Sequence, residues 1–284
     1  MKKRGGFLRS LLFFFILLIF IPTLSCAYPN RIISLTPSVT EMLFAIGAGK
    51  QVIAVTTADD YPALVKKLPK IGGVQVSYEK ILALNPDLVV GEKALVGNQL
   101  IHLEQLGIHT LVLNTKTLGE IPDTLKILGN ETGHIKRADA AASNFLKKLA
   151  QIKNKYDHSP YPRVFIELGD HPLLTTGKDS FLSEAVQAAG GENIGSSLPR
   201  GFEMISEEEV AAENPQVIIL ADGQTSSNIV KRPGWGKISA VLRGKIYSIN
   251  PDLVMRPDLR ILSGILKMAY WFHAVHRKHF IGVH

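Results

Sequence analysis

The chain of 284 residues contains one pattern twice, and this repeat constrains the fold more than any other feature. Residues 77–90 and residues 206–219 match at a constant offset of 129 residues, with Ser, Glu, Ala, Asn and Pro at equivalent places. In each copy, the Ser predicts the start of a short helix, the Asn-Pro pair predicts its end, and an apolar run predicts a buried strand. The repeat therefore predicts two lobes of similar construction.

Strands and helices alternate on both sides of one long helical segment. Apolar runs such as 31–35, 87–90 and 217–220 predict buried strands between helices, which is typical of an α/β layer with a parallel sheet. Residues 135–157 lack Gly and Pro and carry apolar residues at helical spacing, so they predict a connecting helix. The predicted division is a signal at 1–27, an N-terminal lobe at 28–134, the connecting helix at 135–158 and a C-terminal lobe at 159–284.

Ser38 and Glu41 have the spacing of a capping box, in which both side chains satisfy backbone amides at a helix start. We therefore expect a helix to begin at Ser38, directly after the strand at 31–35. Gly47 and Gly49 then predict its end.

The first 27 residues have the pattern of a secretory signal peptide. Four basic residues accompany an apolar run of eleven residues at 11–21, which is shorter than the roughly 20 residues that span a membrane. Small residues predict cleavage after Ala27, and hence export out of the cytoplasm. Leu24-Ser25-Cys26 also resembles the end of a bacterial lipoprotein signal, so a membrane anchor on a lipidated Cys26 is the alternative.

The formal charge of +7 comes largely from this segment. Residues 1–27 hold four of the 32 Lys and Arg and none of the 25 Asp and Glu, so residues 28–284 carry only +3. Such a balance does not favour a nucleic-acid partner. Because Cys26 is the single cysteine, the sequence excludes an internal disulfide framework and a multi-cysteine metal site.

No catalytic motif stands out in the sequence. The Gly-Lys-Asp-Ser at 177–180 lacks the upstream glycine of a phosphate-binding loop, and neither GxSxG nor HExxH occurs. His273, His276 and His279 have helical spacing, but we expect a solvated helix end there rather than a metal site. We therefore expect no enzyme activity, metal or cofactor, while a secreted α/β enzyme is the alternative from another class.

Several motifs together resemble those of one protein family. Taken in order over residues 30–275, they are similar to the class III periplasmic substrate-binding proteins of ABC importers, which deliver vitamin B12, haem and iron–siderophore complexes. Residues 172–194 and the surroundings of DYP at 60–62 resemble the branch that binds vitamin B12. The motifs are RIISLTPSVTEMLFAIGAG at 31–49, DYP at 60–62, SYEKILALNPDLVV at 77–90, LEQLGI at 103–108, PLLTTGKDSFLSEAVQAAGGENI at 172–194, SEEEVAAENPQVII at 206–219 and PGW at 233–235.

This resemblance implies two Rossmann-like α/β lobes joined by a single long α-helix, with the ligand in a cleft between the lobes. It implies cobalamin or a related corrinoid as the ligand, with haem or an iron–siderophore complex as the alternative. One glutamate of each lobe would dock on arginines of the transmembrane permease, and the motif match gives Glu79 and Glu208. A partner ATPase would supply the energy, and we expect the chain to act as a monomer.

The resemblance also implies a set of ligand-binding positions. Aromatic residues sandwich the flat ligand in the resembling branch, and Phe202 keeps one of these positions. Ala58, Gly73 and Leu168 stand where the family pattern has aromatic residues, so the aromatic lining is thinner here. Asp252 matches a polar position of the second lobe.

Further candidates come from residue chemistry. Asp59 belongs to the DYP region, and His171 follows a predicted strand end, where it is a candidate ligand to haem iron or corrinoid cobalt. Tyr61 is a second candidate haem ligand. Arg256, with Arg200 and Arg260, is a candidate partner for carboxylates of the ligand.

Overall fold

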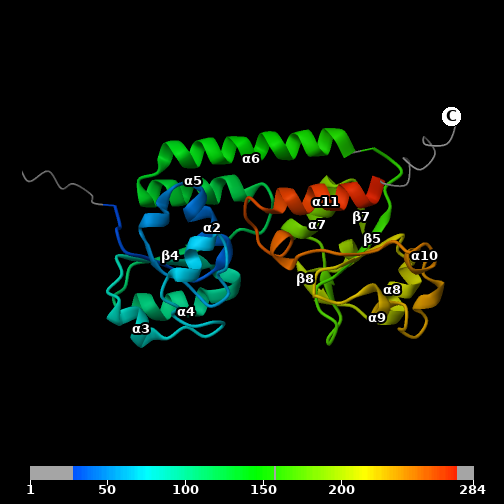
Figure 1. The fold of residues 1–284 in the computed structure, drawn as a ribbon, viewed down its shortest axis with the longest axis horizontal. Coiled ribbons are helices and arrows are strands. Elements are labelled where there is room, and N and C mark those ends of the chain that lie inside the picture. Colours follow the sequence, from blue (N-terminus) through cyan, green and yellow to red (C-terminus); the bar gives the residue numbers. More distant parts are fainter. Residues whose placement is uncertain (1–27, 157, 274–284) are drawn as a thin grey trace, which may run out of the picture.

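The computed structural model describes residues 28–156 and 158–273. Figure 1 shows two α/β lobes side by side, with one long helix, α6 (Ile135–Tyr156), running along both. This is the predicted fold class, and α6 coincides with the predicted connecting helix.

Four parallel strands form the sheet of the N-terminal lobe, in the order β2-β1-β3-β4. They are β1 (Ile32–Ser34), β2 (Val52–Ala54), β3 (Leu88–Glu92) and β4 (Thr110–Leu113). Its helices are α2 (Pro37–Ala45), α3 (Tyr78–Ala83), α4 (Lys93–Gln105) and α5 (Glu120–Thr132). Both β1 and β3 are fully buried, which matches the near-continuous apolar runs that a parallel sheet covered on two faces requires.

The C-terminal lobe has a second parallel sheet, in the order β10-β9-β5-β7. Its strands are β5 (Arg163–Glu167), β7 (Glu192–Asn193), β9 (Val217–Leu220) and β10 (Ile246–Ser248), and an antiparallel pair is added by β6 (Leu174–Thr176) and β8 (Phe202–Met204). Its helices are α7 (Phe181–Ala188), α8 (Glu207–Glu213), α9 (Ser226–Ile229), α10 (Ser239–Leu242) and α11 (Ile261–His273). Counted along the chain, both four-stranded sheets place their strands second, first, third, fourth, so the lobes share one topology.

Short 3₁₀ segments complete the connections. They are η1 (Ala48–Lys50), η2 (Ala63–Lys67), η3 (Ile194–Ser197), η4 (Trp235–Lys237) and η5 (Pro251–Leu253).

The sequence repeat forms the same unit in both lobes. Ser77 caps α3 by accepting from the Lys80 amide at 3.2 Å, and Ser206 caps α8 by accepting from the Glu209 amide at 3.1 Å. Each helix is followed by an asparagine with φ near +45°, a conformation that asparagine tolerates better than most residues. The predicted helix, turn and strand are thereby confirmed in both copies.

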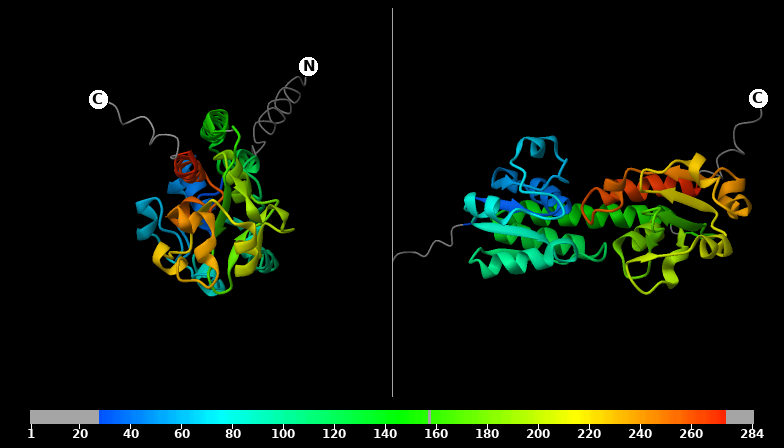
Figure 2. Two further views of the ribbon diagram at one scale, coloured as in Figure 1. Left: turned by 90° about the vertical axis from the view of Figure 1, so that its right-hand side faces the viewer. Right: turned by 90° about the horizontal axis from the view of Figure 1, so that it is seen from below.

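Helix α6 connects the lobes through one apolar stripe. Its buried residues recur every three or four positions, as expected of a helix with one face on the core: Ala138, Ala142, Phe145, Leu149 and Ile152. Figure 2 shows α6 extending behind both lobes, and it packs on α5 of the first lobe and on α7 and α11 of the second. One rigid helix therefore limits how far the lobes can separate.

The predicted capping box at Ser38 and Glu41 is wrong. Helix α2 begins at Pro37 instead, and its N-cap residue Thr36 makes no side-chain cap. The fixed φ of proline suits the first helical position, where no amide is needed. Glu41 is buried and its carboxylate bonds to Arg256 and Arg260, so it does not turn back to the helix start.

Some predictions fall outside the described residues. These are the signal peptide at 1–27 with Cys26, and His276 and His279. Among the helices of 28–156 and 158–273, none combines the length and hydropathy needed to cross a membrane. The division at 28–134, 135–158 and 159–284 stays a prediction about folding units.

Candidate ligand cleft between the lobes

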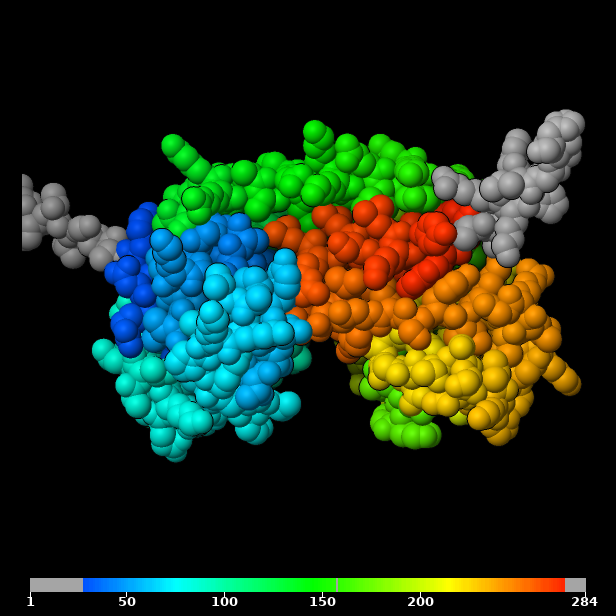
Figure 3. Space-filling view, viewed as in Figure 1, coloured from blue at the N-terminus to red at the C-terminus, as the bar shows by residue number. Residues whose placement is uncertain are grey.

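A cavity of about 480 Å³ lies between the two lobes. Figure 3 shows the hollow there, below α6 and between the cyan and the yellow-green parts of the surface. Several lining residues follow the carboxyl ends of β3 and β4, where ligands of open parallel sheets gather. The lining residues are Pro37, Ser38, Glu92, Ala94, Leu95, Thr115 and Lys116 of the first lobe, and Asp179, Ser180, Phe181, Pro199, Arg200, Gly201, Phe202, Met255, Arg256 and Pro257 of the second.

Apolar side chains face the cavity from both lobes. Leu95 on α4 is 68% exposed, and Phe202 on β8 is 49% exposed. Phe181 supports the Phe202 ring edge-on, with 6.2 Å between the ring centroids. Exposed apolar groups on opposite walls suit a large flat ligand that buries them on binding.

Two exposed cations also line the cavity from opposite lobes. Lys116 follows β4, and Arg200 precedes β8, with its Nε 3.4 Å from a carboxylate oxygen of Glu203. Between the apolar walls, these charges can pair with anionic groups of a ligand.

Glu92 is the buried carboxylate at the first-lobe wall. It accepts from the Thr115 amide at 3.0 Å and from the Thr115 hydroxyl at 2.7 Å. The Thr115 hydroxyl also lies 2.8 Å from the Thr124 hydroxyl, so Thr115 connects Glu92 to helix α5.

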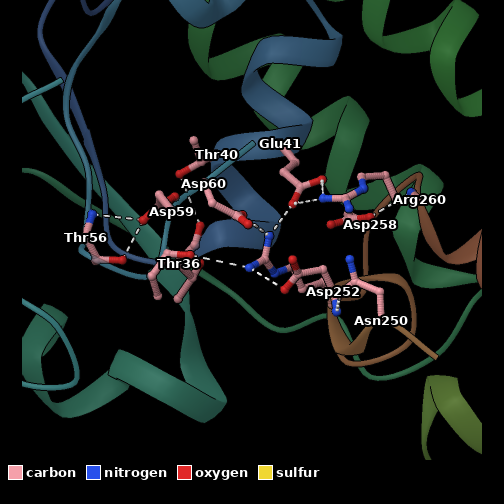
Figure 4. A network of polar contacts seen from close by, with 12 residues as sticks. Thr36, Thr40, Glu41, Thr56, Asp59, Asp60, Asn250, Asp252, Asp258 and Arg260 are labelled. Atoms are coloured by element: carbon pink, nitrogen blue, oxygen red, sulfur yellow. Dashed lines mark hydrogen bonds and ion pairs between the residues drawn. The ribbon is translucent and has the colours of Figure 1, made fainter. Parts of the chain in front are cut away.

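Arg256 joins the cavity to a network of charges that Figure 4 shows. Its guanidinium lies 2.6 Å from Glu41, 2.9 Å from Asp60 and 2.6 Å from Asp252. Arg260 lies 3.0 Å from Glu41. Burial raises the pKa of Glu41, and the two guanidinium groups oppose that effect.

Asp258 is completely buried beside this network. Burial, reinforced by repulsion from Glu41, raises the pKa of Asp258 well above its usual range. One of its oxygens accepts from the Arg260 amide at 2.7 Å.

A second buried charge cluster lies at the carboxyl end of β5. Arg232 donates two hydrogen bonds to Glu167, at 2.6 and 2.8 Å, and one to Asp170 at 2.5 Å. Burial raises the pKa of Glu167 to about 7, with Arg232 opposing and Asp222 adding to the rise. The Arg232 guanidinium also covers the Trp235 ring at 4.7 Å from its centroid.

The structure places the predicted ligand residues at different depths. Phe202 and Arg256 line the cavity, and Asp252 and the Ala58 carbonyl both contact the Nη2 atom of Arg256, at 2.6 and 3.4 Å. Asp59 is buried, where its carboxylate accepts from the Thr56 amide and hydroxyl.

Arg200, a further predicted candidate, also lines the cavity, whereas Leu168, Gly73, His171 and Tyr61 do not. Leu168 is buried in the core, and Gly73 is half-buried in the loop before α3. The His171 side chain is 89% exposed and lies 3.5 Å from Asp170. The Tyr61 ring lies under the Arg260 guanidinium, 4.5 Å from the ring centroid.

Several lining residues were not foreseen from the sequence. Glu92, Thr115 and Lys116 follow strand ends, so the rule that ligands gather at the carboxyl ends of parallel strands could have found them. Leu95 and Met255 carry no comparable signal, because an exposed leucine or methionine is common on protein surfaces.

A smaller cavity of about 290 Å³ is lined by the C-terminal lobe alone, near Tyr161, Gln187 and Glu192. The interlobe cavity is the better candidate because both lobes contribute to it. Within 28–156 and 158–273, no group of three or more His, Cys, Asp or Glu side chains is arranged to hold a metal ion.

The predicted docking residues occupy matching places in the first turns of α3 and α8. Both Glu79 and Glu208 are exposed, and both helices lie on the side of the molecule away from α6 (Figure 1). Hydrogen bonds from its own backbone amide and from the Ser77 hydroxyl lower the pKa of Glu79. In α8 the capping role falls to the next residue, Glu209, which leaves the Glu208 carboxylate outside the cap.

Two α/β lobes, one connecting helix and a cavity lined by both lobes define a solute-binding protein. Residues 32–253 match the model of the periplasmic binding protein family, and the chain belongs to this family.

Relatives and solved structures agree with this assignment. The chain is 35% identical to a vitamin B12-binding protein of Pectobacterium atrosepticum, over 84% of this chain and 87% of that protein. It is 33% identical to an uncharacterized ABC transporter substrate-binding lipoprotein of Bacillus subtilis, over 85% of this chain and 79% of that protein.

Among solved structures, the periplasmic vitamin B12 binding protein of Vibrio cholerae matches with a TM-score of 0.79 and 29% identity, covering 88% of this chain and 98% of that chain. A periplasmic heme binding protein of Pseudomonas aeruginosa matches with a TM-score of 0.78 and 26% identity, covering 87% and 93%.

Proposed function

We propose that the chain binds cobalamin or a related corrinoid between its lobes and delivers it to the permease of an ABC importer. The observation that carries this proposal is the interlobe cavity of about 480 Å³ in a chain 35% identical to a vitamin B12-binding protein. Leu95 and Phe202 offer apolar surface to a flat ring from opposite walls. The role is binding without catalysis, in keeping with the names of the relatives.

Among the predicted positions that line the cavity, we propose Phe202 and Arg256 as direct contacts of the corrinoid. Asp252 and Ala58 act through Arg256. For Asp59, Gly73, Leu168 and His171 we propose a supporting role around the cleft.

Haem or an iron–siderophore complex is the second candidate ligand. Lys116 and Arg200 favour it, since they present cations from opposite lobes that would pair with carboxylates. Neither His171 nor Tyr61, the candidate haem ligands, lines the cavity. We therefore place the corrinoid first.

Glu79 and Glu208 are proposed to dock on basic residues of the permease, whose ATPase supplies the energy. Their exposure, their equivalence in the repeat and their position away from α6 support this assignment. Export to the periplasm through residues 1–27 completes the proposal, with cleavage after Ala27 or a lipid anchor on Cys26 as its two forms. The mass of the exported chain distinguishes these forms.

Calorimetric titration with cyanocobalamin and, separately, with hemin tests the ligand. We expect saturable binding of cyanocobalamin, and no binding at tens of micromolar would contradict the corrinoid assignment. Binding of hemin alone would favour the second candidate. For docking, replacement of both Glu79 and Glu208 by Ala should abolish capture of the permease, and unchanged capture would contradict that role.

A further inference from the structure

The segment from Asn250 to Arg260 extends from the C-terminal lobe to the N-terminal lobe before α11 begins, and we call it the strap. Figure 1 shows it reaching toward α2. Arg256 of the strap donates to Glu41 at 2.6 Å and to Asp60 at 2.9 Å. Arg260 donates to both carboxylate oxygens of Glu41, at 3.0 and 3.2 Å. Because all these acceptors belong to the first lobe, the strap is an ionic connection between the lobes.

The centre of this connection is shielded from water. The Glu41 side chain is 4% exposed, and it accepts from both arginines. Salt screens such a pair much less than a surface ion pair, and loss of one partner leaves an uncompensated buried charge. Arg260 adds a cation–π contact with Tyr61, which is another residue of the first lobe.

Arg256 also lines the ligand cavity, which Glu41 and Asp60 do not. Asp252, within the strap, holds the same guanidinium at 2.6 Å. One side chain therefore contacts the cavity, the strap and the opposite lobe.

We propose that Arg256 is a positioning residue that, together with Arg260, sets the spacing of the two lobes through Glu41 and Asp60, and hence the width of the ligand cleft. Helix α6 limits the separation of the lobes, and the strap selects one spacing within that limit. The consequence for ligand affinity rests on the proposed function, whereas the spacing itself can be measured without ligand.

Spin-label distance measurements on the ligand-free protein test the proposal. Cys26→Ser removes the single cysteine, and Val74→Cys and Leu242→Cys place one label on each lobe at positions that are 88% and 71% exposed. We expect a narrow distance distribution, which Glu41→Gln shifts and broadens. Glu167→Gln is the matched control, because it alters a buried carboxylate that pairs with an arginine inside one lobe.

An unchanged distribution in Glu41→Gln, or the same change in both variants, would overturn the proposal. If Glu41→Gln does not fold, Asp60→Asn tests the strap at a half-exposed carboxylate and should shift the distribution in the same direction.

Ligand affinity gives a second measurement. Only the population with the correct spacing binds well. Glu41→Gln should therefore weaken cyanocobalamin binding about 3- to 10-fold, although it substitutes no residue that lines the cavity. Absence of cyanocobalamin binding by the unaltered protein would contradict the proposed function alone, since the distance measurement does not involve the ligand.

Discussion

Each lobe buries one glutamate at the carboxyl end of a central strand, and the two lobes stabilise it differently. In the first lobe Glu92 ends β3 and bonds to the amide and hydroxyl of Thr115. In the second lobe Glu167 ends β5 and bonds to the guanidinium of Arg232, with Asp170 and Asp222 nearby. Neutral hydrogen-bond donors therefore stabilise Glu92, whereas the positive charge of Arg232, which lies among several carboxylates, stabilises Glu167.

This difference has consequences for stability. Removal of a neutral donor costs Glu92 one hydrogen bond, whereas removal of Arg232 leaves the buried Glu167 carboxylate without its opposite charge. The second lobe should therefore be the more sensitive to mutation and to pH at this place, although the two sheets share one topology.

The largest effect is expected from Arg232→Gln. The Arg232 and Glu167 side chains are 9% and 0% exposed, so the variant strands a buried carboxylate and should lose about 3–5 kcal/mol of unfolding free energy. Urea denaturation measures this loss. A loss below about 1 kcal/mol would show that the folded state does not depend on Arg232 to compensate Glu167, and would remove the contrast between the lobes.

The pH dependence of stability should come next. The pKa of Glu167 is about 7 in the folded chain against 4.5 as its ordinary value. The folded state therefore binds the proton more tightly, and this contribution to stability is complete below pH 4.5 and is lost as the pH rises to about 7. The loss is at most about 3 kcal/mol.

Glu167→Gln should flatten this part of the stability curve, as measured by denaturation at pH 4.5, 6 and 7.5. An identical slope in the variant and the unaltered protein would assign the pH dependence to other groups, such as Glu41 or Asp258.

Thr115→Val tests the first lobe with a nearly isosteric change. It removes the hydroxyl contacts with Glu92 and Thr124 but keeps the backbone amide that bonds Glu92. We expect a loss of about 1–2 kcal/mol in urea denaturation, smaller than that of Arg232→Gln. A loss equal to or above that of Arg232→Gln would contradict the expectation that the second lobe is the more sensitive to mutation.

The smallest expected effect concerns the two walls of the cleft. Phe202→Ala should weaken cyanocobalamin binding about 10-fold, because an aromatic face is lost, and Leu95→Ala about 3-fold. Calorimetry measures both. If the Leu95 variant loses more affinity than the Phe202 variant, the first lobe makes the dominant contact.

The sequence was sufficient for the architecture because that information is local and periodic. The repeat at 77–90 and 206–219 predicts two similar lobes, and the apolar stripe of 135–157 predicts the helix between them. It did not predict α5 or the β6–β8 pair. The strands of that pair have only three residues each, too few to show an alternating pattern.

The site was harder to predict because its contacts join distant parts of the chain. Glu41 has the spacing of a capping box, yet it bonds to Arg256 across 215 residues, and no local pattern records such a partner. The two lobes also share a contact that lies partly outside the repeated segments of the sequence. Arg31 donates to the Asn85 carbonyl at 3.0 Å, and Arg163 donates to the Asn214 carbonyl at 3.3 Å, at the start of equivalent strands.

The central claim is that both lobes hold one ligand between them, and hydrogen exchange with and without cyanocobalamin tests it most directly. Backbone amides exchange more slowly where a ligand excludes water and reduces opening. We predict protection both after β4, at residues 115–118, and along β8, at residues 202–204. Protection confined to one lobe, or to the smaller cavity near Glu192, would contradict the claim.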